Sequence, residues 1–299
     1  MRFAGRFWEV RPELVGQTVQ LRFDPHQPHA CPPKVFRDDR FVCDSVPLDR
    51  LANSLRRRPR PADRPDPAVR ATGLPAGLPV FNPVGDTQAS FLGSVPQVDS
   101  TILVNLGPGG QVCWAVPAFE PPGERVETRP LPGSGALRVG ASLCGGAAYA
   151  WLNRTLRACL AEFGLEADEE TVYHRLNTRA AASPAVGGLR VRTTFLGVRG
   201  DPSVHGGAIE GITLENMTPG ALARATLTGL VDELHDLYRG EAGSDAGRVR
   251  LVAAGGAVGQ NPLLLDILGQ RFGLPTELAA HREAAAVGAA LLAARAGAR

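Results

Sequence analysis

The chain has 299 residues, which is long enough for one large domain or two modest domains with proper hydrophobic cores. Hydrophobic residues make up 44% of the chain and charged residues 21%, which indicates a soluble globular protein and excludes a disordered one. No segment has the roughly 18 consecutive apolar residues of a membrane span, and residues 1–10 are too polar for a signal peptide. We therefore expect neither a membrane segment nor a signal peptide.

Cysteine and charge usage indicate the compartment and the class of partner. The five cysteines are odd in number and form no C-x-x-C pair, which favours reduced, mostly buried thiols in a cytoplasmic protein. The net charge of +2 conceals an asymmetry, because residues 1–70 carry 14 basic and 9 acidic side chains. This excess is a weak indication of nucleic acid binding. Lys34 is the only lysine, so a lysine nucleophile or phosphate clamp is excluded from residues 71–299.

Residues 1–52 have the pattern of a small all-β module. We expect four or five short strands in a barrel-like arrangement, at residues 6–10, 18–23, 34–36 and 40–42, with a turn at Asp38-Asp39. Phrases at residues 12–16, 21–25 and 46–49 resemble the C-terminal β-barrel of Mu-type and related integrase-like transposases. The resemblance, over residues 6–50, implies DNA binding through residues 1–60. The alternative is an unrelated β-module with a mildly basic face.

Two polar segments follow or interrupt this module. His26, His29 and Cys31 have zinc-ligating side chains, but prolines interrupt them and no fourth ligand is suitably spaced, so we expect a loop and no metal. Residues 53–70 are rich in proline and arginine and have no periodic apolar face, which predicts an extended linker. The alternative role of these arginines is contact with a phosphate backbone.

From residue 71 to residue 299 the pattern is that of an α/β domain. Residues 102–106 predict a buried strand that runs into a glycine turn, and residues 111–116 predict the strand that leaves it. Thr218 is expected to cap a helix and Gly240 to end it. The other expected elements are helices from 140, from 261 to 272 and from 283 to 291, and a strand at 248–254.

Three glycine-containing phrases carry the candidate chemistry. Residues 84–93 place one carboxylate and one amide on a tight glycine turn, and residues 105–111 and 254–262 form two further glycine-rich turns. A carboxylate can deprotonate a hydroxyl that attacks a phosphoryl group. Backbone N–H groups at glycine turns and helix starts bind anions. The combination predicts a site for a hydroxyl-bearing substrate and a polyphosphate.

Together, these phrases resemble the C-terminal half of the FGGY carbohydrate kinases, most closely the sedoheptulokinase-like branch, over residues 72–299. The resemblance implies an actin-like, ribonuclease H-like ATPase lobe that uses ATP, yields ADP, requires Mg²⁺ and acts on a ketose such as sedoheptulose. It further implies paired strands at residues 195–202 and 207–212. It also implies a catalytic base at Asp86, substrate contacts at Thr87 and Gln88, and nucleotide contacts at Gly107, Gly109, Gly255, Gly256 and Asn261.

Plainer interpretations of the same residues stay open. Asp86 would also serve as the cap of a helix expected to begin near Ala89. The turn from Gly255 to Asn261 would also serve as an ordinary connection between a strand and a helix.

The chain departs from the family in two respects. Pro108 stands where the family commonly has threonine between two glycines, and proline offers neither a hydroxyl nor a backbone N–H. In addition, nothing before Thr72 resembles the family's N-terminal lobe, which supplies most sugar contacts. Because phosphoryl transfer needs both halves of the cleft, we expect no kinase activity from this chain alone.

The alternatives to a kinase half concern binding. One is a lobe that binds adenine nucleotide, docks onto a separate N-terminal lobe or forms a homo-oligomer. The other is the DNA-binding remnant of a transposase fusion.

Overall fold

The computed structural model describes residues 2–3, 6–14, 17–24, 32–47, 81–119, 121, 123–133, 135–183, 188–201, 203–242 and 247–297. Residue contacts divide the chain into two units, Met1–Pro83 and Val84–Arg299, which are described separately. The expected linker at 53–70 lies outside the described residues, as do His26, His29 and Cys31. The domain boundaries at residues 52 and 70 therefore stay predictions.

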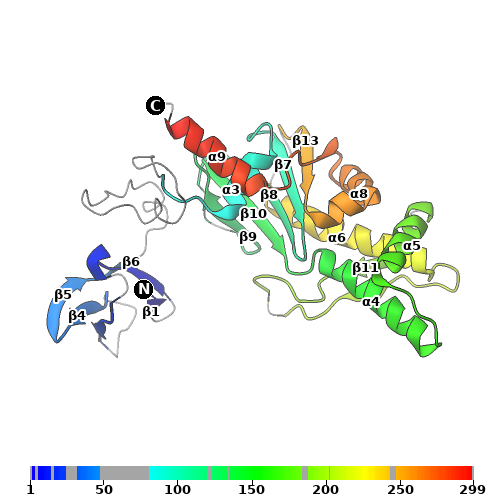
Figure 1. Cartoon of the computed structure of the whole chain (residues 1–299), viewed down its shortest axis with the longest axis horizontal. Coiled ribbons are helices and arrows are strands. Elements are labelled where there is room, and N and C mark those ends of the chain that lie inside the picture. The colour runs from blue at the N-terminus through cyan, green and yellow to red at the C-terminus, as the bar shows by residue number, and fades with distance from the viewer. Residues whose placement is uncertain are drawn as a thin grey trace. The chain divides into compact units, whose positions relative to one another are not determined.

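The N-terminal unit is all-β apart from one 3₁₀ turn over its described residues (Figure 1). Its strands pair antiparallel in two three-stranded sheets, β1-β2-β6 and β3-β4-β5, and no described pairing joins the two sheets. Asp38 and Asp39 form the predicted turn between β4 and β5 with φ of 48° and 60°. The elements are β1 Arg2–Phe3, β2 Arg6–Glu9, η1 Pro12–Leu14, β3 Gln20–Arg22, β4 Lys34–Arg37, β5 Arg40–Asp44 and β6 Val46–Pro47.

The C-terminal unit is organised around a six-stranded mixed sheet of order β14-β13-β7-β8-β10-β9. β7, β13 and β14 run parallel, whereas β7, β8, β10 and β9 are antiparallel neighbours. The hairpin predicted around the glycine turn is confirmed as β7 and β8, in which Asn105 is paired with Gln111. The strands are β7 Thr101–Leu106, β8 Gly110–Val116, β9 Val126–Pro130, β10 Ala136–Ser142, β13 Arg250–Ala254 and β14 Thr276–Leu278, and a separate hairpin pairs β11 Arg190–Arg192 with β12 Ala208–Glu210.

Helices cover both faces of this sheet (Figure 1). Ile102 and Val104 of β7 pack in one buried cluster with residues of α6 and other helices. Leu103 packs on the opposite face of the sheet with Phe91 of α3. Burial on both faces explains why the central strands read as nearly continuous apolar runs. The helices are α3 Asp86–Ser94, α4 Gly146–Glu162, α5 Glu169–Ala182, α6 Pro219–Ala242, α7 Gly256–Gln260, α8 Pro262–Phe272 and α9 Ala284–Gly297.

Helices α3 and α9 meet backbone to backbone on one face of the sheet. A Cβ atom built on Gly288 would overlap the carbonyl of Ala89, and one built on Gly93 would overlap the carbonyl of Ala284. Glycine at both positions is therefore a steric requirement of the crossing. The small-residue helix predicted from residue 283 is confirmed as α9, and it fixes the helix that begins at Asp86.

Three local predictions are wrong. Residues 140–142 end strand β10 rather than open a helix, because Gly140 packs against Val112 and Leu237 in the sheet–helix interface, and α4 begins only at Gly146. Residues 195–201 form turns with one isolated bridge between Val198 and Asp201, and β12 pairs with β11, which the sequence did not reveal. Helix α6 continues past Gly240 to Ala242.

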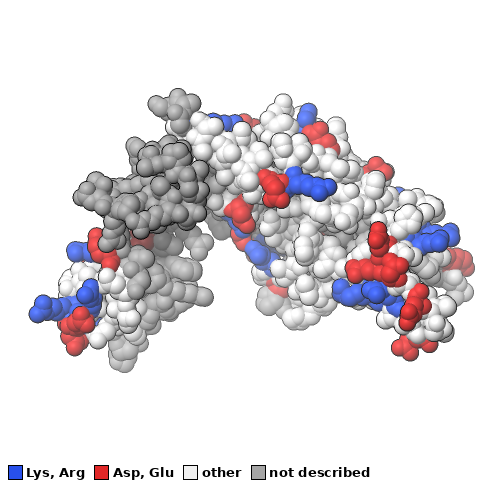
Figure 2. Space-filling model, viewed as in Figure 1, with Lys and Arg blue, Asp and Glu red and all other residues white. Residues whose placement is uncertain are grey.

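Other predictions of local structure are confirmed. Thr218 caps α6, since its Oγ1 accepts a hydrogen bond of 3.2 Å from the N–H of Ala221. The four described cysteines are free thiols, and all but Cys159 are buried. None of the described helices combines the length and apolar character that a membrane crossing requires. On the face drawn in Figure 2, basic and acidic side chains of the described residues are intermixed.

Candidate active site

The glycine turns at residues 107–110 and 255–256 lie together at the carboxyl ends of β7 and β13. These strands are parallel neighbours, so the turns that follow them share one edge of the sheet. Gly255 has φ of 99°, and a Cβ at this position would overlap the carbonyl of Leu106. Glycine is therefore required at 255 both for its conformation and for the close approach of the two turns.

The start of α4 packs directly onto the turn at residues 107–110. The N–H of Gly146 donates to the carbonyl of Gly107 at 2.8 Å, and the N–H of Ala147 donates to the carbonyl of Pro108 at 3.1 Å. These first-turn donors would otherwise be free to bind an anion. Together with the absence of an N–H on Pro108, these bonds reduce the number of backbone donors available to a phosphate group.

A polar cavity of about 360 Å³ lies beside this turn, on the α3 side of the sheet. Asp86 and Arg199 are the only acidic and the only basic residue among the described residues that line it. Burial raises the pKa of the Cys113 thiol, which also lines the cavity, to about 12. The cavity is lined by Asp86, Thr87, Ser90, Leu103, Asn105, Gly107, Pro108, Gly109, Gly110, Gln111, Cys113, Ala141, Ser142, Leu143 and Arg199.

Asp86 is the first residue of α3 and is exposed to solvent. Its Oδ1 accepts a 2.7 Å hydrogen bond from the N–H of Thr87, so the carboxylate satisfies one free donor of the first helical turn. The helix begins at Asp86, three residues earlier than expected, and its N-cap is Gly85. The carboxylate is thus held by the helix start and still faces the cavity.

A chain of polar side chains connects Thr87 to Arg199. Arg129 donates to Thr87 Oγ1 at 2.8 Å and also to Glu127, with Nη2–Oε2 at 2.7 Å. The other carboxylate oxygen of Glu127 accepts from Arg199. Burial raises the pKa of Glu127, but hydrogen bonds and charge attraction from Arg129 and then Arg199 outweigh this effect and hold the pKa below its ordinary value. Glu127 therefore acts as an ionised link between the two arginines.

A tight turn presents Arg199 to the cavity. Gly197 and Gly200 have φ of 83° and 85°, and the N–H of Asp201 donates to the carbonyl of Val198 at 3.2 Å. A Cβ on Gly200 would lie 2.8 Å from the carbonyl oxygen of Glu124, so the turn packs against that neighbouring segment. Sequence reasoning missed Arg199; the only local signal is an arginine between two glycines that need positive φ.

The predicted site residues separate into two groups. Asp86, Thr87, Gly107 and Gly109 are brought together around the cavity, and Gly255 and Gly256 follow β13 at the same edge of the sheet. Gln88 and Asn261 are not among the residues that line the cavity.

Gln88 and Asn261 use their amides within the fold. Gln88 Nε2 donates to the carbonyl of Pro130 at 3.4 Å. Asn261 is buried, and its Nδ2 donates to Asn177 Oδ1 at 3.1 Å. The same oxygen of Asn177 also accepts a hydrogen bond from the hydroxyl of Tyr149 at 2.8 Å. Asn261 thus joins α4, α5 and α8 in an internal network.

Comparisons with known proteins agree with this arrangement. The C-terminal domain of the FGGY family of carbohydrate kinases matches residues 126–297. Human sedoheptulokinase is 30% identical over 225 residues, which cover 73% of this chain and 46% of that protein, and mouse sedoheptulokinase matches to the same extent. The chain spans less than half the length of these relatives.

Solved structures show the same fold. Xylulose kinase from Rhodospirillum rubrum matches with a TM-score of 0.66 and 28% identity over 77% of this chain and 45% of its own. Plasmodium falciparum glycerol kinase with ADP matches with a TM-score of 0.55 and 18% identity over 72% of this chain and 42% of its own. The mixed sheet with helices on both faces is thus an actin-like ATPase lobe, and the chain belongs to the FGGY family of carbohydrate kinases, whose C-terminal domain it contains.

Proposed function

We propose that the chain supplies the C-terminal half of the active site of an ATP-dependent kinase for a ketose such as sedoheptulose. The observation that carries this proposal is the position of Asp86, an exposed carboxylate that faces a polar cavity beside the glycine turn at residues 107–110. The 30% identity to human sedoheptulokinase supports the substrate class.

Asp86 would act as the general base. It accepts the proton of the acceptor hydroxyl while the hydroxyl oxygen forms a bond to the γ-phosphorus of ATP. The bond from the γ-phosphorus to its bridging oxygen breaks, and ADP leaves with that electron pair. Mg²⁺, when bound with ATP, would supply charge neutralisation at the phosphate oxygens. Asp86 is the only carboxylate among the described residues that line the cavity, and it would face the ion through water, because Mg²⁺ keeps several waters and the base must stay free to accept the proton.

Arg199 would provide the positive charge that the glycine turn lacks. Pro108 offers no hydroxyl and no N–H, and the N–H groups of Gly146 and Ala147 are bonded to turn carbonyls. A guanidinium has five N–H donors, so Arg199 keeps donors for a phosphoryl group while it is bonded to Glu127. We therefore assign Arg199 to the transferred phosphoryl group and Glu127 to the positioning of Arg199.

The proposal separates binding from turnover. Phosphoryl transfer needs in-line positioning and exclusion of water by both halves of a cleft. We propose that these residues bind adenine nucleotide by themselves and that turnover requires a second lobe.

Titration calorimetry with ATP on the full chain tests nucleotide binding. We expect measurable affinity, and a loss of about tenfold in Arg199→Ala because charge-assisted hydrogen bonds are removed. Arg295→Ala, at an exposed position of α9, is the matched control and should bind as the unmodified chain does. Absence of ATP binding at millimolar concentration would overturn the proposed function.

An activity assay with sedoheptulose and ATP tests the requirement for a second lobe. We expect no phosphorylated sugar from the purified chain. Turnover that is lost in Asp86→Asn and kept in Asp266→Asn, an exposed aspartate of α8, would contradict this expectation while supporting Asp86 as the base.

A further inference from the structure

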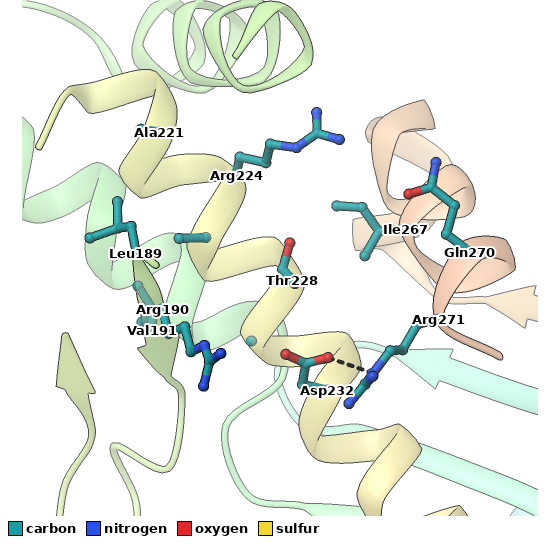
Figure 3. Close-up of a pocket in the computed structure, with 12 residues that line it drawn as sticks. Leu189, Arg190, Val191, Ala221, Arg224, Thr228, Asp232, Ile267, Gln270 and Arg271 are labelled. Atoms are coloured by element: carbon teal, nitrogen blue, oxygen red, sulfur yellow. Dashed lines mark ion pairs between the residues drawn. The ribbon is translucent and has the colours of Figure 1, made fainter. Parts of the chain in front are cut away.

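A second cavity, of about 450 Å³, lies between α6, α8 and β11 (Figure 3). It shares no lining residue with the cavity that contains Asp86, and none of the proposed catalytic residues reaches it. A cavity of this size falls in the range that small organic ligands occupy. Its lining residues are Leu189, Arg190, Val191, Ala221, Arg224, Ala225, Thr228, Gly229, Asp232, Ile267, Gln270 and Arg271.

The spacing of residues along α6 explains why space is left here. Ala221, Ala225 and Gly229 recur every four residues and therefore lie on one face of the helix, where their small side chains leave room. A Cβ on Gly229 would overlap the carbonyl of Val191, so the helix rests directly on β11 at one end of the cavity. On the side toward α8, Arg224 and Thr228 of α6 border the same space opposite Ile267 (Figure 3).

The cavity combines an apolar floor with a basic rim. Leu189, Val191, Ala225 and Ile267 are buried and present only apolar side chains. Three arginines from three different elements reach the rim, namely Arg190 of β11, Arg224 of α6 and Arg271 of α8 (Figure 3). Asp232 is the only carboxylate among the described lining residues. The rim therefore carries an excess of positive charge.

The positive charges are unequally balanced. Arg271 is paired with Asp232, with Nε–Oδ1 at 2.7 Å, and lies 3.7 Å from Asp236. Arg224, in contrast, donates to the neutral carbonyl of Ala180 at 3.3 Å and forms no ion pair with any described residue, although it is half-buried. A partly desolvated guanidinium without a counter-charge is unfavourable, and an anion at the rim would relieve this cost.

We propose that this cavity binds a small organic anion, with its phosphate or carboxylate at the arginine rim and an apolar or aromatic body on the floor. The anion would accept hydrogen bonds from Arg224, and its body would cover Leu189, Val191 and Ile267. This site is separate from the proposed catalytic site and does not depend on it.

Titration calorimetry on the full chain with four probes tests this proposal. Phenyl phosphate and benzoate each carry an anion and a ring, inorganic phosphate lacks the ring, and benzyl alcohol lacks the charge. We expect at least one ring-bearing anion to bind about tenfold more tightly than both inorganic phosphate and benzyl alcohol. The preferred ring-bearing anion identifies phosphate or carboxylate as the group recognised.

Variants locate the binding. Arg224→Met keeps the side-chain length and removes the charge, and Thr228→Leu places a larger side chain where Thr228 points into the cavity in Figure 3. Each should weaken binding about tenfold. The matched controls are Arg282→Met and Thr178→Leu, both at exposed positions outside the cavity.

Three outcomes would overturn the proposal. The first is equal affinity for the ring-bearing anions and benzyl alcohol, and the second is unchanged binding in both cavity variants. The third is loss of binding in Arg199→Ala, which would place the anion in the other cavity. Urea denaturation of each variant identifies any that fail to fold, and Arg224→Lys, which restores the charge, should recover binding.

Discussion

The two faces of the central sheet use small residues in opposite ways. On one face, Gly93 and Gly288 let α3 and α9 touch backbone to backbone. On the other face, Ala221 and Ala225 of α6 line a cavity of about 450 Å³ beside α8, and only Gly229 at its end packs directly on β11. The first arrangement fixes the helix that begins at Asp86, whereas the second leaves room for a ligand. Alanine and glycine in a helix thus predict a close contact or an open space only when the partner element is known.

The largest expected effect comes from filling the tight helix crossing. Gly288→Ala would place a Cβ against the carbonyl of Ala89, so α9 must move away from α3. We expect a loss of about 3 kcal/mol in the free energy of unfolding, measured by urea denaturation. The control is Gly259→Ala in α7, where a Cβ meets no atom within 4 Å, and its effect should stay within about 0.5 kcal/mol. Equal effects would remove the steric reason for glycine at the crossing.

A smaller effect is expected at the turn after β13, where glycine is sterically required at one of two adjacent positions and not at the other. Gly255→Ala requires a left-handed conformation and overlaps the carbonyl of Leu106, so we expect a loss of about 2 kcal/mol in the free energy of unfolding. Gly256→Ala has open space around the added carbon and no positive φ, and should change stability by less than about 0.5 kcal/mol. Urea denaturation of both variants measures these two changes in the free energy of unfolding.

The smallest effect concerns one carboxylate on each face and depends on pH. Glu127 has a pKa below its ordinary value of 4.5, because Arg129 and Arg199 outweigh the effect of burial. Its contribution to stability is present above pH 4.5 and is lost as the pH falls through the lower folded pKa. Glu127→Gln should therefore cost about 1 kcal/mol or less at pH 7, because the side chain is partly exposed, and the deficit should vanish in acid.

Glu233 of α6 is expected to show the opposite dependence. Burial raises its pKa above 4.5, and hydrogen bonds from Ser142 and Thr193 offset this only in part. The folded state then holds the proton more tightly, so this residue reduces stability as the pH rises above 4.5. Glu233→Gln should become more stable relative to the unmodified chain between pH 4 and pH 7. Parallel pH profiles for the two variants would contradict the assignment of the two environments.

The sequence predicted the hairpin of β7 and β8 and the glycine turns, and it predicted a helix after Asp86, which begins three residues earlier than expected. It could do so because these features depend on neighbouring residues, such as the apolar run before Gly107. The resemblance to transposases and DNA binding by residues 1–60 stay predictions.

The rest of the candidate site depends on residues that are far apart in the chain. Arg199 reaches Glu127 across 72 residues, and Arg129 reaches Thr87 across 42. These contacts follow from the sheet order β8-β10-β9, whereas no local pattern indicated β9 or the strand character of residues 140–142. The second cavity was missed for the same reason, since the gap between α6 and α8 depends on tertiary packing.

The buried thiol of Cys113 has a consequence for the chemistry of the cavity that contains Asp86. Electrophiles and oxidants react with thiolates, and a thiol with a pKa of about 12 is almost entirely protonated at neutral pH. The cavity therefore places a sulfur atom near the proposed catalytic carboxylate without making the site sensitive to oxidation through that residue.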